Sequence, residues 1–417
     1  MINCRMFRFF TVVFFLIWAS ATSQDRLLDS ESEHLLGLID TTAIEALTLD
    51  DTLFLIQRPK VLNSGVKIVD KRLTDIDLES KLVYLDKQTP IELQANHLVM
   101  REVENYLAAS DRQLAKWMGA GAYYFPLFEE VLYRNNLPLE LKFLPVLESG
   151  LRPRVESRSG ARGLWQLMYG TAKENGLKMS SYVDERTDPI LSTQAACNYL
   201  KKMHRLYGDW LLALAAYNAG PGNINKAISR SGGKRNYWEI RAYLPQETRD
   251  YIPRFIAINY LFNSQIEHSI GQIQPKIFYQ QVDTVVVNRN IPLRLIAEHL
   301  AIEFEQLKFI NPAYTYDIIP GTSMDRYPLR LPMNKLSDWQ SKKQELYQRL
   351  DTLEAEKKVV YPKFEEQLYR KVYRVASGDY LGKIAEKFKV KVSHIKKWNS
   401  LKSNKLKIGQ TLIIFKN

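Results

Sequence analysis

Glu148 is the residue of this chain whose neighbours best suit acid–base chemistry. It ends the apolar stretch from Leu141 to Leu147 and comes just before a helix-ending glycine, Gly150. Because apolar surroundings disfavour the ionised form, a half-buried carboxylic acid at this point has a raised pKa and can hold a proton near neutral pH. Cleavage of a glycosidic bond needs such a proton donor. Taken alone, the same carboxylate could instead pair with Arg152 or Arg154, or lie exposed.

Other kinds of catalytic chemistry find little support. The six histidines are scattered without i, i+4 pairs, and no CxxC can form from two cysteines, so we expect no metal site and no cofactor. The glycine pairs are too short for a phosphate-binding loop, and no GxSxG motif is present. Cys4 lies in a segment expected to be removed, so Cys197 has no partner for a disulfide within the mature chain.

The region from about Glu92 to Phe262 is predicted to be helical, because its apolar residues recur at spacings of three and four. One helix should begin after Asp209, which can cap it, and end at Gly220-Pro221. Another should run from Pro189 to Tyr207. Its buried face should carry Ile190, Thr193, Cys197, Leu200 and Met203.

Three motifs in this region occur in order. The first runs from Glu148-Ser149-Gly150 through Ser157, Gln166 and Met168 to Ala172; the second is Ala215-Ala-Tyr217-Asn218-Ala-Gly-Pro-Gly222; the third is Glu247-Thr-Arg-Asp-Tyr251-Ile-Pro253. Together they resemble the soluble-lytic-transglycosylase (SLT) type of lysozyme-like domain, over roughly Glu92 to Phe262. Two positions depart from the usual pattern, namely Tyr169 in place of a proline and Leu151 in place of an aromatic residue.

The resemblance implies a role for each matching residue. Glu148 would be the catalytic acid and base, and Tyr251 would hydrogen-bond and orient it. The substrate cleft would include Ser157, Gln166, Met168, Tyr217 and Asn218. Without the order of the motifs, Met168 and Tyr217 would be better interpreted as core residues, Asn218 as a helix C-cap and Ser157 as a turn residue.

The resemblance also implies a reaction. Glu148 would protonate the β-1,4 glycosidic oxygen between N-acetylmuramic acid and N-acetylglucosamine in peptidoglycan, and would then take the proton of the C6 hydroxyl. The product would carry a 1,6-anhydromuramic end, in cell-wall turnover or remodelling. Most glycosidases use two carboxylates. If Glu156, Asp184, Asp188 or Asp209 faced Glu148, a hydrolytic muramidase of the lysozyme type would result, and a non-catalytic peptidoglycan-binding scaffold is the alternative from another class.

Two short units follow with a similar order of elements. From Val372 to Phe415 we expect strand, helix, helix, strand, and the residues Gly378, Asp379 and Asn399 resemble the glycan-binding groove of a LysM module, which binds polymers containing N-acetylglucosamine. Val282 to Pro332 resembles a degenerate copy without the Gly-Asp turn, which could bind glycan or act as a spacer. The charged stretch between them should be a solvated helical linker rather than a coiled-coil partner site.

The N-terminus predicts export. Residues 1–21 combine two arginines, an apolar run from Phe9 to Trp18 and the small residues Ala19-Ser20-Ala21, the pattern of a secretory signal. The run is shorter than the roughly 20 residues that span a bilayer. A retained anchor is the weaker interpretation, and peripheral membrane association stays open. We therefore expect the protein in the cell envelope or periplasm.

Composition agrees with a multidomain globular protein. The chain has 417 residues, of which 46% are hydrophobic and 25% charged, which excludes a collagen-like or wholly disordered chain. A net charge of +12 favours an acidic polymer as partner. Because the protein is expected to be exported, that polymer should be in the cell envelope and not a nucleic acid.

The predicted fold class is a mainly α lysozyme-like catalytic domain followed by small α+β (βααβ) LysM modules. The predicted boundaries are a signal peptide at 1–21, a partly extended segment at 22–90, the SLT domain at 91–270, a divergent LysM-like module at 278–333, a charged helical linker at 334–370 and a LysM domain at 371–416.

Overall fold

The computed structural model describes residues 75–108, 110–322, 325–363, 369–388, 390–399, 401 and 403–416. The predicted signal peptide and most of the predicted N-terminal segment lie outside these residues. No helix among the described residues is long and apolar enough to cross a bilayer. The last part of the predicted extended segment is in fact helix α4 (Asp75–Asp86), because Leu78 and Leu82, one turn apart, are both buried in the core.

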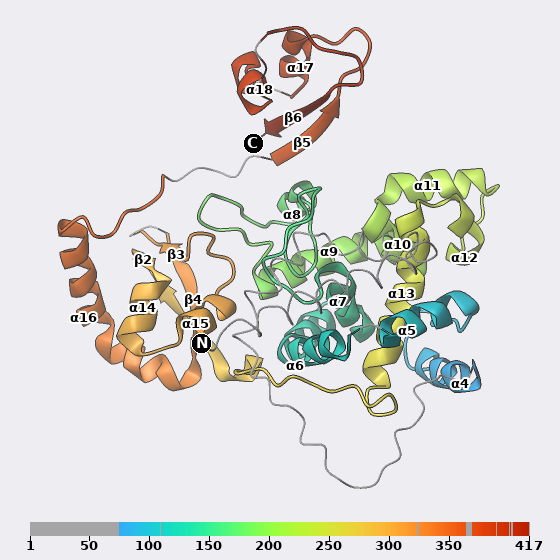
Figure 1. Cartoon of the computed structure of the whole chain (residues 1–417), viewed down its shortest axis with the longest axis horizontal. Coiled ribbons are helices and arrows are strands. Elements are labelled where there is room, and N and C mark those ends of the chain that lie inside the picture. Colours follow the sequence, from blue (N-terminus) through green and yellow to red (C-terminus); the bar gives the residue numbers. More distant parts are fainter. Residues whose placement is uncertain are drawn as a thin grey trace, which may run out of the picture. The chain divides into compact units, whose positions relative to one another are not determined.

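A helical domain follows, as predicted (Figure 1). Its helices are α5 (His97–Ala108), α6 (Asp111–Arg134), α7 (Leu144–Ser149), α8 (Tyr169–Glu174), α9 (Pro189–Tyr207), α10 (Trp210–Ala219), α11 (Pro221–Arg230), α12 (Tyr237–Ile240) and α13 (Gln246–Asn263), with 3₁₀ turns at Leu139–Phe143 and Arg241–Tyr243.

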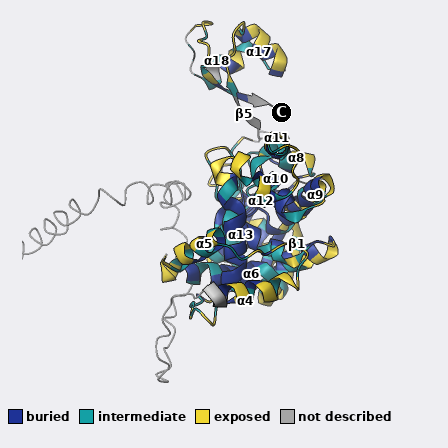
Figure 2. Ribbon diagram, turned by 90° about the vertical axis from the view of Figure 1, so that its right-hand side faces the viewer, coloured by how far each residue is buried: buried dark blue, intermediate teal, exposed yellow. Residues whose placement is uncertain are grey.

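Helix α10 lies at the centre of this domain. All six residues from Leu211 to Ala216 are buried, as expected of a helix covered on every side, and α10 packs against α9 and α13. The Asp209 carboxylate caps its start by accepting the Leu212 amide at 2.7 Å. The predicted bounds of α9 and α10 are confirmed, and Cys197 is a buried free cysteine on α9. Helices α6 and α13 are also buried over much of their length (Figure 2).

The divergent LysM-like module begins with a 3₁₀ turn at Tyr279–Gln281. Strands β1 (Val282–Val287) and β4 (Tyr327–Pro332) pair antiparallel, with Val282 opposite Pro332. Helices α14 (Leu293–Leu300) and α15 (Phe304–Ile310) lie between these strands in the sequence. A second short pair, β2 (Asn290–Pro292) with β3 (Ile318–Pro320), was not predicted.

The charged stretch that follows forms α16 (Leu336–Ala355), after a 3₁₀ turn at Met333–Lys335. The expectation of a solvated linker is wrong for this helix. Trp339, Leu346 and Leu350 are almost fully buried, and α16 packs against α14. These three residues form a narrow apolar stripe on an otherwise polar helix, and the stripe completes the core of the LysM-like module.

The C-terminal module has the predicted βααβ order. Strand β5 (Tyr369–Arg374) pairs antiparallel with β6 (Thr411–Lys416), and α17 (Leu381–Phe388) and α18 (Val392–Trp398) lie between them in sequence. The module has a hydrophobic cluster of its own, which includes Ile384, Ile395 and Leu412.

One asparagine in each module confirms the internal repeat. Asn399 donates to the carbonyls of Ile395 (2.9 Å) and Ile413 (2.7 Å) and accepts the Ile413 amide. Asn311 donates to Leu307 and Arg330 carbonyls at 2.8 and 2.9 Å and accepts the Arg330 amide. Each side chain therefore joins the end of the second helix to the last strand.

The LysM-like module is held to the helical domain by buried polar contacts. Arg330 of β4 pairs with Asp188 at 2.8 Å, and Asp188 also caps α9. The Asp184 amide donates to the Ala313 carbonyl at 2.9 Å, and the Thr187 hydroxyl to the Pro312 carbonyl at 2.9 Å. One continuous hydrophobic core extends through both parts. The predicted boundary near residue 270 therefore separates two sequence modules that share a core.

Candidate active site

Glu148 lies in the last turn of the short helix α7. Gly150 ends this helix in the left-handed conformation (φ 59°), and its amide donates to the Val146 carbonyl at 3.0 Å. A Cβ at Gly150 would lie 3.0 Å from the Trp117 indole nitrogen, so glycine suits both the turn and the close packing. Next to Glu148, the buried Ser149 hydroxyl donates to Pro145 and Leu164 carbonyls, both at 2.9 Å. The backbone around Glu148 is therefore fixed on both sides.

The partner of the Glu148 carboxyl is Tyr251, one of the predicted catalytic pair. The hydroxyl of Tyr251, which is buried on α13, donates to Glu148 Oε1. The two arginines considered from the sequence have other contacts as well. Arg152 donates to the Ser149 carbonyl, and Arg154 reaches across to Asp317 of the LysM-like module.

The electrostatics of Glu148 suit proton transfer near neutral pH. Burial raises its pKa to about 7, the hydrogen bond from Tyr251 pulls the pKa down, and the negative charge of Glu247 pushes it up. The raised pKa predicted from the apolar sequence context is thus reproduced. A carboxyl with this pKa can give a proton and take one back in the same catalytic cycle.

Tyr217 is the third member of this cluster. Its hydroxyl donates to the Trp165 carbonyl at 2.5 Å, and both burial and the nearby Glu148 charge raise its pKa well above the usual value. The next residue, Asn218, accepts a hydrogen bond from the Thr248 hydroxyl at 2.8 Å. The end of α10 is thereby joined to the start of α13, which carries Tyr251.

The other three predicted cleft residues lie in the segment between α7 and α8. The Ser157 hydroxyl accepts the Ala161 amide at 3.0 Å, and the Gln166 side chain donates to the Gly163 carbonyl at 2.8 Å. Both side chains therefore brace their own loop. Met168 is 36% exposed, so its thioether side chain is open to solvent. The structure brings Glu148, Tyr251 and Tyr217 together, while the substrate roles of these loop residues stay predictions.

Gly163 is a structural requirement of this loop that the sequence interpretation passed over. Its φ is +87°, and a Cβ would lie 1.9 Å from the Arg186 carbonyl oxygen. The neighbouring Trp165 is fully buried and donates to the Thr193 hydroxyl at 2.8 Å. Glycine suits both the positive φ and the close approach to the Arg186 carbonyl, which is a tertiary contact that the local sequence does not reveal.

The departure at Tyr169 falls on the first residue of α8. A proline is well suited to that position because the amide it lacks would have no helical partner there. Tyrosine also fits, so the replacement leaves the helix start intact. The second departure, Leu151, is buried with φ 61°.

The four carboxylates considered as a second catalytic group have other partners. Asp184 is fully buried and pairs with Arg186 at 2.7 Å, Asp188 and Asp209 cap helices, and Glu156 lies 3.5 Å from Arg162. The carboxylate whose charge acts on Glu148 is instead Glu247, which the sequence interpretation did not single out. It is exposed and lies one helical turn before Tyr251.

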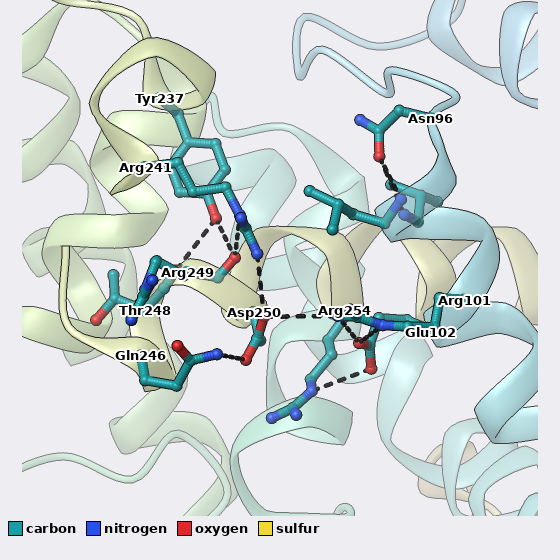
Figure 3. A network of polar contacts seen from close by, with 12 residues as sticks. Asn96, Arg101, Glu102, Tyr237, Arg241, Gln246, Thr248, Arg249, Asp250 and Arg254 are labelled. Carbon is teal, nitrogen blue, oxygen red and sulfur yellow. Dashed lines mark hydrogen bonds and ion pairs between the residues drawn. The ribbon is translucent and has the colours of Figure 1, made fainter. Parts of the chain in front are cut away.

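A polar network fixes α13 where it carries Tyr251 (Figure 3). The buried Asp250 accepts from Arg241 at 3.1 Å and from Gln246 at 2.7 Å. One turn later, Arg254 donates to the buried Glu102 of α5 at 3.3 Å. Charged pairs therefore clamp the helix on both sides of the tyrosine.

The predicted glycan-binding residues of the C-terminal module form its turns. Gly378 has φ +81°. The Asp379 carboxylate accepts the Tyr373 hydroxyl at 2.5 Å and the Ala376 amide at 2.9 Å, which lowers its pKa. Asn399 is committed to the backbone bonds described above. The side-chain polar atoms of Asp379 and Asn399 thus stabilise the module, and glycan contact by the three residues remains a prediction.

Within the described part of the chain, no group of three or more histidine, cysteine, aspartate and glutamate side chains could hold a metal ion.

Comparisons with known proteins follow the same division of the chain. Residues 126–240 match the transglycosylase SLT domain, residues 281–348 the LysM-like domain of lytic transglycosylase MltD, and residues 373–415 the LysM domain.

The chain is also similar to individual proteins. The chain is 27% identical over 345 residues to membrane-bound lytic murein transglycosylase D of Escherichia coli strain K12, covering 79% of this chain and 72% of that protein. It is 33% identical over 132 residues to the soluble lytic murein transglycosylase of Salmonella typhimurium, covering 30% of this chain and 20% of that protein. A crystal structure of the 70 kDa soluble lytic transglycosylase of Escherichia coli aligns with a TM-score of 0.30 and 26% identity over 36% of this chain and 26% of that chain.

The resemblance inferred from the three motifs is confirmed: the chain contains a transglycosylase SLT domain, followed by a LysM-like domain of the MltD type and a LysM domain, and this order of domains together with its similarity to lytic murein transglycosylases supports lytic transglycosylase activity.

Proposed function

We propose that this protein cleaves the β-1,4 bond between N-acetylmuramic acid and N-acetylglucosamine in peptidoglycan and leaves 1,6-anhydromuramic ends. The observation that carries the proposal is the Glu148 carboxyl, with a pKa of about 7 and a hydrogen bond from Tyr251, inside an SLT domain. Relatives of this chain are lytic murein transglycosylases, which supports the same substrate.

The chemistry needs one carboxyl group. Protonated Glu148 gives its proton to the glycosidic oxygen as the C1–O bond breaks, and the N-acetyl group of the muramic residue stabilises the positive charge at C1. Ionised Glu148 then takes the proton of the C6 hydroxyl, whose oxygen bonds to C1. Glu148 ends the cycle protonated, and no water is consumed.

Tyr251 prepares Glu148 for both steps. Its O–H is a donor fixed on a buried helix, so it stabilises the carboxylate between the two proton transfers and holds Oε1 in one orientation. Tyr217, held by the Trp165 carbonyl, closes the other side of the cluster.

The rival reaction is hydrolysis by a lysozyme-type muramidase. It requires a second carboxylate, and Glu247 is the candidate because its charge acts on Glu148. The exposed position of Glu247 favours the single-carboxylate mechanism, since an exposed carboxylate is well solvated and its effect is screened.

Mass spectrometry of the products tests both reactions. Purified peptidoglycan is incubated with the native protein, with Glu148→Gln and with Glu247→Gln. We expect anhydromuropeptides from the native protein and Glu247→Gln, and none from Glu148→Gln. Reducing-end products heavier by one water would establish a muramidase, and loss of products with Glu247→Gln would identify its second carboxylate. A native protein that binds peptidoglycan but releases nothing would instead be a scaffold.

Export to the periplasm, possession of a signal peptide and membrane association belong to the same proposal. The substrate lies in the cell envelope, so the enzyme must reach it, and residues 1–21 have the composition of a secretory signal. The C-terminal LysM module would bind glycan and raise the local concentration of substrate around the catalytic domain. The LysM-like module serves a structural role, because its buried contacts are with the catalytic domain.

A further inference from the structure

The positive charge of this protein is concentrated in its last module. Residues 373–415 contain ten lysines and arginines and two acidic residues, a net charge of +8 out of +12 for the whole chain. The LysM-like domain at residues 281–348 contains eight basic and eight acidic residues. Two modules of related fold in one chain thus differ by eight charges, so the charge is not a requirement of the fold.

Several of these cations surround two loops. Lys383 donates to the Gly378 carbonyl at 3.3 Å in the loop after β5, and Arg374 donates to the Gly409 carbonyl at 3.3 Å in the loop before β6. The Gly409 amide in turn donates to the Val375 carbonyl at 2.7 Å, so the two loops lie side by side. Lys407 is exposed in the second loop.

The same loops present apolar side chains to solvent. Tyr380 is 63% exposed and Ile408 is 75% exposed. Exposed tyrosine and aliphatic side chains are the surfaces on which a sugar ring can pack, and here they stand among cations. The ligand that fits this combination is a glycan that carries negative charges beside its sugar rings.

The two acidic residues of the module are too few to neutralise its ten basic residues. Asp379 accepts bonds from the Tyr373 hydroxyl and the Ala376 amide and forms an ion pair with Lys383 at 3.8 Å, so it offsets one of these cations. The other acidic residue, Glu386, is exposed on α17. The module therefore keeps an excess of positive charge, part of it on the residues of its two loops.

We propose that the C-terminal LysM module recognises peptide-substituted glycan, with Arg374, Lys383 and Lys407 attracting the carboxylates of the wall peptides. This deepens the proposed function, on which it rests, by assigning peptide recognition to one of the two modules. Each exposed ion pair contributes little by itself, but several cations facing a polyanion act together and give binding that weakens with salt.

Co-sedimentation of the full chain with peptidoglycan tests this assignment. All proteins carry Glu148→Gln, so that binding is measured without cleavage. The test variant adds Arg374→Gln, Lys383→Gln and Lys407→Gln. The matched control adds Arg326→Gln, Lys342→Gln and Lys343→Gln, which remove three exposed cations from the LysM-like domain. Each protein is mixed with intact peptidoglycan, with glycan stripped of its peptides by an amidase, and with vesicles of anionic phospholipid.

We expect the test variant to bind intact peptidoglycan about tenfold more weakly at low salt, with the difference shrinking at high salt. Binding to stripped glycan should change less than twofold, and the control variant should bind all ligands normally. Equal losses on intact and stripped glycan, or equal losses in the two variants, would overturn the proposal. So would a loss confined to the anionic vesicles, which would identify a membrane as the partner.

Two further measurements separate this proposal from its assumptions. A variant with Arg374→Lys, Lys383→Arg and Lys407→Arg keeps the charge and should keep the binding, whereas misfolding of the loops would abolish it in both substituted forms. The three glutamine substitutions without Glu148→Gln should leave cleavage of short soluble glycan fragments unchanged. Absence of any cleavage by the native protein would refute the proposed function and not the assignment of peptide recognition.

Discussion

Replacement of Tyr251 by phenylalanine separates the two contributions to the pKa of Glu148. The substitution removes one hydroxyl and leaves the buried ring in place on α13. Because the hydrogen bond from this hydroxyl stabilises the ionised carboxylate, its loss raises the Glu148 pKa above about 7. Glu148 must be protonated to start the reaction, so activity is lost as the pH rises through this pKa. The variant should therefore stay active to higher pH than the native enzyme.

The size of the shift follows from the energy of the bond. A hydrogen bond to a charged group contributes about 1.5–3 kcal/mol, which corresponds to about 1–2 pKa units at about 1.4 kcal/mol per unit. Water entering the space left by the hydroxyl would offset part of this, so we expect the alkaline limb to move up by about one unit. The plateau value of kcat/KM should fall about a hundredfold, because the carboxyl also loses its orientation.

The assay is the initial rate of release of soluble muropeptides across a pH series at constant ionic strength. Tyr217→Phe is the matched control, since that hydroxyl donates to the Trp165 carbonyl and not to Glu148. Its rate can fall, but its alkaline limb should stay where the native limb is. An alkaline limb that stays fixed or moves to lower pH in Tyr251→Phe would refute the assigned role of the tyrosine.

Three further predictions concern stability. Glu148→Gln should raise the free energy of unfolding by an amount on the order of 3 kcal/mol above pH 7 and by little below pH 4.5, because the folded protein resists ionisation of Glu148. Thermal unfolding above pH 7 and below pH 4.5 measures this, and an equal stabilisation at both pH values would contradict the prediction. Gly163→Ala should lower the free energy of unfolding by about 2–4 kcal/mol and remove most of the activity. Gly160 also has a positive φ (+84°) but open space around its Cβ position, so Gly160→Ala should lower the stability by only about 1 kcal/mol, and similar losses in the two variants would show that φ alone matters. Arg330→Met should lower the free energy of unfolding by about 3–5 kcal/mol, because it leaves the buried Asp188 carboxylate without its cation. Chemical denaturation measures this, and a loss below about 1 kcal/mol would mean that the contact does not hold the LysM-like module to the catalytic domain.

The parts of this protein that the sequence predicts best are those set by local signals. Helices α9 and α10 begin at aspartate caps and end at glycines, so their bounds follow from neighbouring residues. Glu148 stands out because the apolar residues that raise its pKa precede it directly in the chain. Tyr251 was reached only by motif resemblance, since nothing near it in the sequence indicates that its hydroxyl meets a carboxyl 103 residues away.

The parts that escaped prediction depend on distant packing. Strands β2 and β3 have three residues each, too few for an alternating pattern to emerge. Helix α16 is strongly polar, and only its contact with α14 explains why Leu346 and Leu350 are buried. The negative charge of Glu247 raises the Glu148 pKa because α13, which carries Glu247, packs against α7, which carries Glu148. This packing is a tertiary contact that no local sequence pattern indicates.

Because the catalytic domain and the LysM-like module share one continuous core, the two should be inherited together when domains recombine between proteins. Sequence families divide this chain into three domains, but its described residues form two hydrophobic cores, one between Asp75 and Ala355 and one in the C-terminal module. A chimera that replaces the C-terminal module should fold, because the replacement leaves every residue of the larger core in place. A chimera joined near residue 270 would have to restore a complete buried interface, so recombination at that point should be rare among functional proteins.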